Sequence, residues 1–153
     1  MSIDPKFHII TYLTQSQSGR FGYQERRNEI RTIYNIVKGM DDVFLIVKIH
    51  PTENDTEVYG KLAEEIGLER YAIVRNELPL DDLLLSSKIA ITKNSTTGFN
   101  ALIAGCVLIV VGFHDKKFSN NFFMEAGVAL TATSSEELYN NIRKALTEDK
   151  EEL

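Results

Sequence analysis

Short apolar runs alternate with amphipathic helical patterns along almost the whole chain, and this alternation restricts the possible folds more than any other feature. A strand can pair in parallel with the next strand only after a long crossover connection, which is usually a helix. Strands that alternate with helices therefore indicate βαβ units and a parallel sheet. Such a sheet is covered by helices on both faces, so its strands are nearly continuously apolar. The sequence therefore predicts an α/β fold with three layers.

The boundaries of the elements follow from periodicity and from helix start and stop signals. Gly39, Gly67 and Gly105 each follow a helical pattern and indicate its end. Ser134 and Glu137 form a capping-box pattern that opens the last helix. We expect strands at 7–13, 43–49, 71–74, 89–92, 107–111 and 128–131, and helices at 23–38, 57–66, 79–87, 96–104 and 134–147.

These elements predict a Rossmann-like three-layer sandwich with a parallel sheet of about six strands. A chain of 153 residues fits one domain, with a core at 7–147 and short tails at 1–5 and 148–153. The helix at 23–38 carries Arg26, Arg27 and Arg31, which we expect to form a solvated face.

Composition excludes several classes of function. The net charge of −5 argues against binding to nucleic acid or to an anionic membrane. The single cysteine, Cys106, excludes an internal disulfide framework and a cysteine-based zinc site. No carboxylate–histidine cluster has metal-ligand spacing, and the sequence contains neither a Walker A loop nor a G-x-G-x-x-G loop, so we expect neither a metal nor a cofactor. The longest apolar stretch, 101–113, is too short to span a bilayer, and residues 1–6 lack a signal-peptide pattern, so a cytoplasmic protein is expected.

Polar and small residues gather after the predicted strands. In a doubly wound parallel sheet, ligands bind at the carboxyl ends of the strands. The segments that follow four of the strands are 14–22, 50–52, 93–98 and 112–117. They contain hydroxyls, histidines, glycines and cations, so this edge of the sheet is the predicted site.

The strongest of these segments joins a buried strand to a helix and contains Ser95, Thr96, Thr97 and Gly98. Unpaired backbone N–H groups and the positive end of a helix form an anion site, and hydroxyl groups add further donors to a phosphate. The alternative is plain helix capping, since Ser and Thr are preferred at that position in any helix.

His50 ends a buried strand, and Pro51 stops that strand. An imidazole at this edge can donate a hydrogen bond to a phosphate oxygen, or it can simply bond to a neighbouring loop. In the loop after the first strand, Gly19 permits close backbone approach and Arg20 can pair with an anion. Stretches rich in Gln, Ser and Gly are, however, most often plain loops.

Residues 47–51, 95–102, Gly105 and 107–110 resemble the C-terminal, donor-binding half of GT-B glycosyltransferases. The most similar groups are capsular and surface polysaccharide enzymes, including polysialyltransferases, Kdo transferases and teichoic-acid polymerases. Those enzymes carry a His-Pro motif and a paired Ser/Thr motif, which contact the nucleotide–phosphate part of the donor. The resemblance covers the chain from Phe7 to about Leu146.

The resemblance implies roles for individual residues. His50 would stabilise the leaving phosphate, while Ser95, Thr96 and Thr97 would bind the phosphate at the helix start. Gly98 would allow close approach of the donor. Asn100 stands where these families usually place a Glu that holds the ribose or sugar hydroxyls, and Asn can hydrogen-bond there but carries no charge.

The resemblance also implies a partner, because a GT-B enzyme has two Rossmann-like halves and 153 residues suffice for one. We expect a donor domain for surface or capsular polysaccharide synthesis, inactive without an N-terminal acceptor domain or a partner subunit. The donor would be a UDP-, CDP- or CMP-linked sugar, and the partner could bring the chain to the inner face of the membrane. The alternatives are half of a sugar-nucleotide 2-epimerase and a noncatalytic α/β module that binds a protein.

Overall fold

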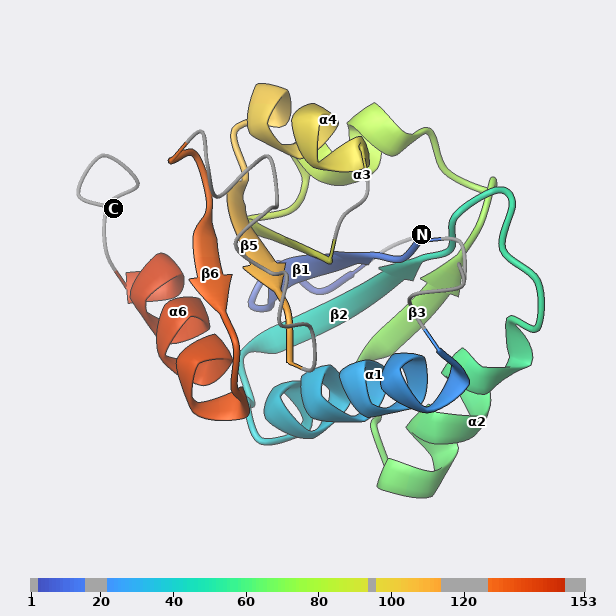
Figure 1. Ribbon diagram of the computed structural model, residues 1–153. Helices are drawn as coiled ribbons and strands as arrows, with labels where there is room; N and C mark the ends of the chain where they lie inside the picture. Colours follow the sequence, from blue (N-terminus) through green and yellow to red (C-terminus); the bar gives the residue numbers. More distant parts are fainter. Residues whose placement is uncertain (1–2, 16–21, 94–95, 114–126, 148–153) are drawn as a thin grey trace.

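Six parallel strands form one sheet in the order β3-β2-β1-β4-β5-β6 in the computed structural model (Figure 1). The structure describes residues 3–15, 22–93, 96–113 and 127–147. The strands are β1 (His8–Leu13), β2 (Val43–Lys48), β3 (Tyr71–Val74), β4 (Ile89–Thr92), β5 (Val107–Val111) and β6 (Leu130–Ala132). The helices are α1 (Tyr23–Lys38), α2 (Glu57–Ile66), α3 (Leu80–Leu85), α4 (Thr97–Ala104) and α6 (Ser135–Thr147). The predicted α/β fold with a six-stranded parallel sheet is confirmed.

The observed boundaries agree closely with the predicted ones except near the last strand. β6 spans Leu130–Ala132 rather than 128–131, and Val128 is exposed. The pairing of Val111 with Ala132 explains this shift, because a buried Ala132 completes the register with β5. Ser134 accepts the backbone N–H of Glu137 at 3.1 Å, so the predicted cap of α6 is present.

The two faces of the sheet are covered by different helices. Helices α1, α2 and α6 cover one face, and α3 and α4 cover the other (Figure 1). Alternate residues of β1 divide between these faces, with Ile10 and Tyr12 packed into the larger core and Leu13 packed beside α3 and α4. This division is the expected two-residue periodicity of a strand that is buried on both sides.

The strand order reverses beside β1. From β1 the chain adds β2 and then β3 on one side, and it then crosses over to add β4 and β5 on the other side. The loops that leave β1 and β4 therefore turn to opposite faces, and such a switch point is where ligands of doubly wound sheets bind. Thr14 and Lys93 directly follow these two strands.

Candidate functional site

A cavity of about 370 Å³ opens at the carboxyl ends of β1, β2 and β3 and reaches the first residue of α4. Four segments that are distant in the sequence form its walls, because the parallel sheet brings their strand ends to one edge. The lining residues are Leu13, Thr14, Lys48, Ile49, His50, Pro51, Arg75, Asn76, Leu78, Pro79, Leu80 and Thr97.

Two of the predicted site residues, His50 and Thr97, line this same cavity. Gly98 is buried in the first turn of α4, Thr96 is exposed, and Asn100 is half-buried, and none of these three is among the lining residues. Ser95, Gly19 and Arg20 lie outside the described residues. The structure therefore brings together the His-Pro turn and the start of the Ser/Thr helix.

The alternative role of the Ser/Thr segment is plain capping of the helix that follows it, which is α4. Thr96 occupies the cap position, and its side chain makes no cap hydrogen bond within the described part of the chain. The backbone N–H of Phe99 instead donates to the Thr96 carbonyl at 3.1 Å. Within the described part of the chain, the Thr96 side chain therefore does not cap α4, and Thr96 is exposed at the start of this helix.

The imidazole of His50 is held by its own turn. The backbone N–H of Thr52 donates to Nδ1 of His50 at 3.2 Å, and the Thr52 hydroxyl lies 2.9 Å from the same nitrogen. A backbone N–H can only donate, so Nδ1 acts as the acceptor and carries no proton. The neutral ring therefore keeps its proton on Nε2, and we assign this tautomer from the hydrogen bonds. Nε2 is consequently a hydrogen-bond donor.

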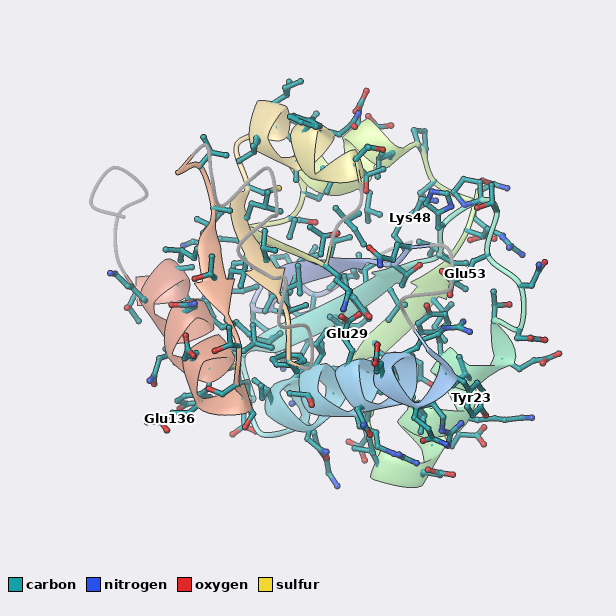
Figure 2. The ribbon with its side chains drawn as sticks, viewed as in Figure 1. Tyr23, Glu29, Lys48, Glu53 and Glu136 are labelled. Atoms are coloured by element: carbon teal, nitrogen blue, oxygen red, sulfur yellow. The ribbon has the colours of Figure 1, made fainter. Side chains whose placement is uncertain are left out.

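Two cations, Lys48 and Arg75, also line the cavity. Lys48 Nζ donates to the carbonyl oxygen of Ile49 at 3.2 Å and to that of Arg75. The Arg75 guanidinium in turn donates to the carbonyl oxygen of Glu53. Carbonyl oxygens carry no net charge, so these bonds orient both cations without neutralising them. Figure 2 shows Lys48 and Glu53 at the same end of β2.

The electrostatics of the cavity favour an anionic ligand. Its described lining contains Lys48, His50 and Arg75 and no Asp or Glu, although the chain as a whole has a net charge of −5. Partial burial of the ammonium is the main cause that lowers the pKa of Lys48; Arg75 adds to this effect, and Glu77 opposes it. Concentration of positive charge in a partly desolvated crevice strengthens its attraction for phosphate.

Sequence reasoning missed Thr14, Lys48 and Arg75 as individual lining residues. The edge predicted from the sequence does not include the segment after β3, although the rule that places ligands at strand ends applies equally to Arg75. Lys48 ends an apolar strand and has no motif of its own. Lys48 stands two residues before His50, but its place in the cavity lining can be inferred only once β2 and β3 are known to be adjacent strands.

The predicted solvated arginine face of α1 is wrong for Arg26. This side chain is buried and pairs with the equally buried Glu53 at 2.6 Å. Arg31, by contrast, stands at the surface 3.8 Å from Glu65. The helical period contained the signal, because Arg26 lies four residues before Ile30 and seven before Ile33, on the stripe that faces the core.

A second buried carboxylate, Glu29, lies between α1 and the sheet (Figure 2). The hydroxyl of Tyr12 donates to its Oε2 atom. Burial raises the pKa of Glu29 to about 7, and the nearby charge of Glu53 acts in the same direction. The Tyr12 hydrogen bond and the charge of Lys93 oppose this rise.

The described residues contain neither a metal-binding cluster nor a membrane-spanning helix. No group of three His, Cys, Asp or Glu side chains in the described ranges is placed to hold a metal ion. In the same ranges, no helix is both long enough and apolar enough to cross a membrane.

Comparison with solved structures shows the fold. A UDP-GlcNAc 2-epimerase from Neisseria meningitidis, solved bound to UDP-GlcNAc, superposes with a TM-score of 0.65 at 11% identity, covering 94% of this chain and 37% of the epimerase. The spinosyn rhamnosyltransferase SpnG superposes with a TM-score of 0.61 at 12% identity, covering 96% of this chain and 39% of SpnG. The chain thus has the fold of about two fifths of each of these proteins.

Comparison of sequences shows the family. The chain is 32% identical over 95 residues to the capsule polysaccharide export protein KpsS of Escherichia coli, covering 56% of this chain and 24% of KpsS. The chain therefore matches about a quarter of the length of that relative. The family model described as "Capsule polysaccharide biosynthesis protein" matches residues 21–118, which is more than half of the chain. On this evidence, the chain belongs to the capsule polysaccharide biosynthesis family.

Proposed function

We propose that this chain is the donor nucleotide-sugar-binding domain of a glycosyltransferase that acts in capsular or surface polysaccharide synthesis. One observation carries the proposal: the cavity at the strand ends joins His50 to the start of α4, and the lining residues that the structure describes include cations and no carboxylate. A nucleotide phosphate is the anionic group that such a crevice between strand ends and a helix start accommodates. Membership of the capsule polysaccharide family supports a saccharide as the rest of the donor.

The donor fits the cavity in two parts. The cavity lining includes the apolar residues Leu78, Pro79 and Leu80, against which a nucleotide base would pack. It also includes His50, Lys48 and Arg75, which would bind the phosphate. Ser95 immediately precedes Thr96 in the sequence, and we assign it the phosphate-binding role that the resemblance to GT-B donor domains implies.

In the proposed reaction, the bond between the anomeric carbon and the donor phosphate oxygen breaks, and a bond to an acceptor hydroxyl oxygen forms. Negative charge develops on the leaving phosphate. The Nε2–H of His50, the charges of Lys48 and Arg75, and the positive end of α4 would stabilise that charge without reorganising. The acceptor hydroxyl loses its proton to a base that we assign to a second, acceptor-binding domain or subunit, as expected for half of a two-domain enzyme.

Titration calorimetry with UDP, CDP and CMP tests the proposal. We expect the chain to bind at least one of them, and we expect His50→Ala and Ser95→Ala each to weaken that binding about tenfold, as the loss of one charge-assisted hydrogen bond does. His8→Ala is the matched control, because His8 begins β1 at the opposite edge of the sheet. Absence of heat with all three nucleotides, or equal binding by all variants, would refute the proposed site.

A further inference from the structure

A buried polar cluster centred on Glu53 packs beneath the turn that carries His50. Three side chains from three other segments donate to the Glu53 carboxylate. Arg26 Nη2 lies 2.6 Å from Oε2, Thr14 Oγ1 lies 2.6 Å from Oε1, and the Tyr59 hydroxyl also donates to Oε2. Both partners of the ion pair are almost fully excluded from water. The cluster therefore joins the end of β1, helix α1 and helix α2 beneath a single turn.

A buried ion pair of this kind is weak evidence of a contribution to stability, since desolvation of both charges offsets most of their attraction. Arg26 also lies over the ring of Tyr59, with its guanidinium carbon 5.0 Å from the ring centroid. An apolar group of similar volume would fill this space at less electrostatic cost. The burial of Arg26 and Glu53 is better explained by the turn that their cluster holds in place, which carries His50.

The cluster holds both backbone polar groups of His50. The N–H of His50 donates to Thr14 Oγ1 at 2.9 Å, and the carbonyl of His50 accepts the N–H of Glu53 at 3.0 Å. Thr14 has a single hydroxyl proton, and we assign it to the 2.6 Å bond to the Glu53 carboxylate rather than to the longer 3.2 Å contact with the Lys48 carbonyl oxygen. The lone pair of Thr14 Oγ1 is then left to accept from His50. A chain of donors thus runs from the His50 amide through Thr14 to the carboxylate, and each bond strengthens the next.

We propose that Thr14 and Glu53 are positioning residues that fix the backbone of His50, so that its imidazole meets the phosphate of a bound nucleotide. The inference rests on the proposed function for its ligand and on the cluster for its geometry. Neither residue is assigned a contact with the reacting atoms. Instead, their hydrogen bonds set the position from which His50 acts.

Substitutions of Thr14 separate this role from simple packing. Thr14→Val keeps the volume but removes the hydroxyl, while Thr14→Ser keeps the hydroxyl. We expect Thr14→Val to weaken binding of the preferred nucleotide about tenfold, and Thr14→Ser to restore it to within about threefold of the wild type. Exchange of the His50 amide with solvent deuterium, followed by NMR without ligand, should become faster in Thr14→Val alone.

Thr11→Val is the matched control. Thr11 is a buried residue of the same strand, and its hydroxyl lies 2.7 Å from the Ser87 hydroxyl, away from the His50 turn. This variant also loses one buried hydroxyl, but we expect it to leave both the nucleotide affinity and the exchange of the His50 amide unchanged. An effect of Thr11→Val equal to that of Thr14→Val would show general destabilisation and would overturn the inference.

The two readouts separate the inference from the proposed function. If the wild type binds no nucleotide, the proposed function fails, while amide exchange still decides whether the cluster holds His50. Unchanged exchange in Thr14→Val overturns the inference, as does changed exchange with unchanged affinity. Tyr59→Phe, which removes a different donor to Glu53, provides the same test if Thr14→Val does not fold. We expect it to have a smaller effect in the same direction.

Discussion

At the scale of single residues, two buried carboxylates lie close to the same sheet edge in different surroundings. Glu53 is paired with the guanidinium of Arg26, whereas Glu29 accepts the hydroxyl of Tyr12. A tyrosine hydroxyl offsets much less of the cost of burying a charge than a guanidinium does. The difference explains why burial dominates at Glu29 and raises its pKa to about 7.

This raised pKa predicts a dependence of stability on pH. Between the ordinary value of 4.5 and about 7, the folded chain keeps a proton on Glu29 that the unfolded chain releases. Stability from this group therefore falls as the pH rises through that window and stays low above it. We expect Glu29→Gln to gain about 2–3 kcal/mol relative to the wild type between about pH 5 and about pH 8.

Urea unfolding of both chains at several pH values in this range measures the gain. Glu64→Gln on α2 is the control, because Glu64 is an exposed carboxylate. A difference between Glu29→Gln and the wild type that does not change with pH would show that Glu29 is ionised in the folded chain throughout the range.

At the scale of the element, α2 contains one glycine in its interior and ends at another. A Cβ atom added at Gly60 would lie 3.8 Å from Ile73 Cδ1, which is an ordinary van der Waals contact. Gly67 terminates the helix in the left-handed region, with φ of 79°, where a side chain is strained. The backbone therefore needs glycine at position 67, where the helix ends, but not at position 60 in the helix interior.

Replacement by alanine should change stability in opposite directions at these positions. We expect Gly60→Ala to stabilise the chain by about 0.5–1 kcal/mol, because it lowers the entropy of the unfolded state without a clash. Gly67→Ala should destabilise it by about 1 kcal/mol, because alanine is strained at positive φ. Urea midpoints of the two variants test this pair, and effects of the same sign would contradict the helix geometry described above.

At the scale of the whole molecule, an ion pair ties the last helix to the first half of the chain. Arg143 on α6 donates to both oxygens of Asp42, before β2, at 3.1 and 3.2 Å. These hydrogen bonds are the main cause that lowers the pKa of Asp42. Its contribution to stability is therefore present at neutral pH and is lost as the pH falls through that lowered value.

A double-mutant cycle with Asp42→Asn and Arg143→Gln measures this link. Both side chains are more than one third exposed, so we expect a coupling free energy of at most about 1 kcal/mol. The coupling should decrease in about 1 M salt, where charges are screened within about 3 Å. A coupling that salt leaves unchanged would indicate packing by the Arg143 side chain rather than attraction between charges.

The fold of the whole chain does not by itself determine a reaction. The same arrangement of strands and helices occurs in a UDP-GlcNAc 2-epimerase and in a rhamnosyltransferase, at 11% and 12% identity. Function belongs to the site that a fold carries, so the cavity lining and the family supply the argument for a donor domain. Asn100 is half-buried on α4 outside that lining, so the expected role of this position in holding the ribose or sugar hydroxyls remains a prediction.

The sequence alone determined the elements of this protein and the edge of the sheet that forms the cavity. Hydrophobic periodicity is a local property, so Ile30, Ile33 and Val37 identify α1 without knowledge of its neighbours. Strand ends are local too, and His50 and Thr97 were both predicted at the edge where the cavity opens. These predictions needed no information about strand order.

Only the tertiary structure decided which of these residues meet and which charges are buried. Strand order follows from long-range packing, so the closeness of the His50 turn to Arg75 depends on β2 and β3 being adjacent. Arginine is usually found at the surface. Arg26 is nevertheless buried, because the carboxylate of Glu53, 27 residues away in the sequence, pairs with its guanidinium. Burial of a charge depends on a partner distant in sequence, and no local pattern identifies that partner.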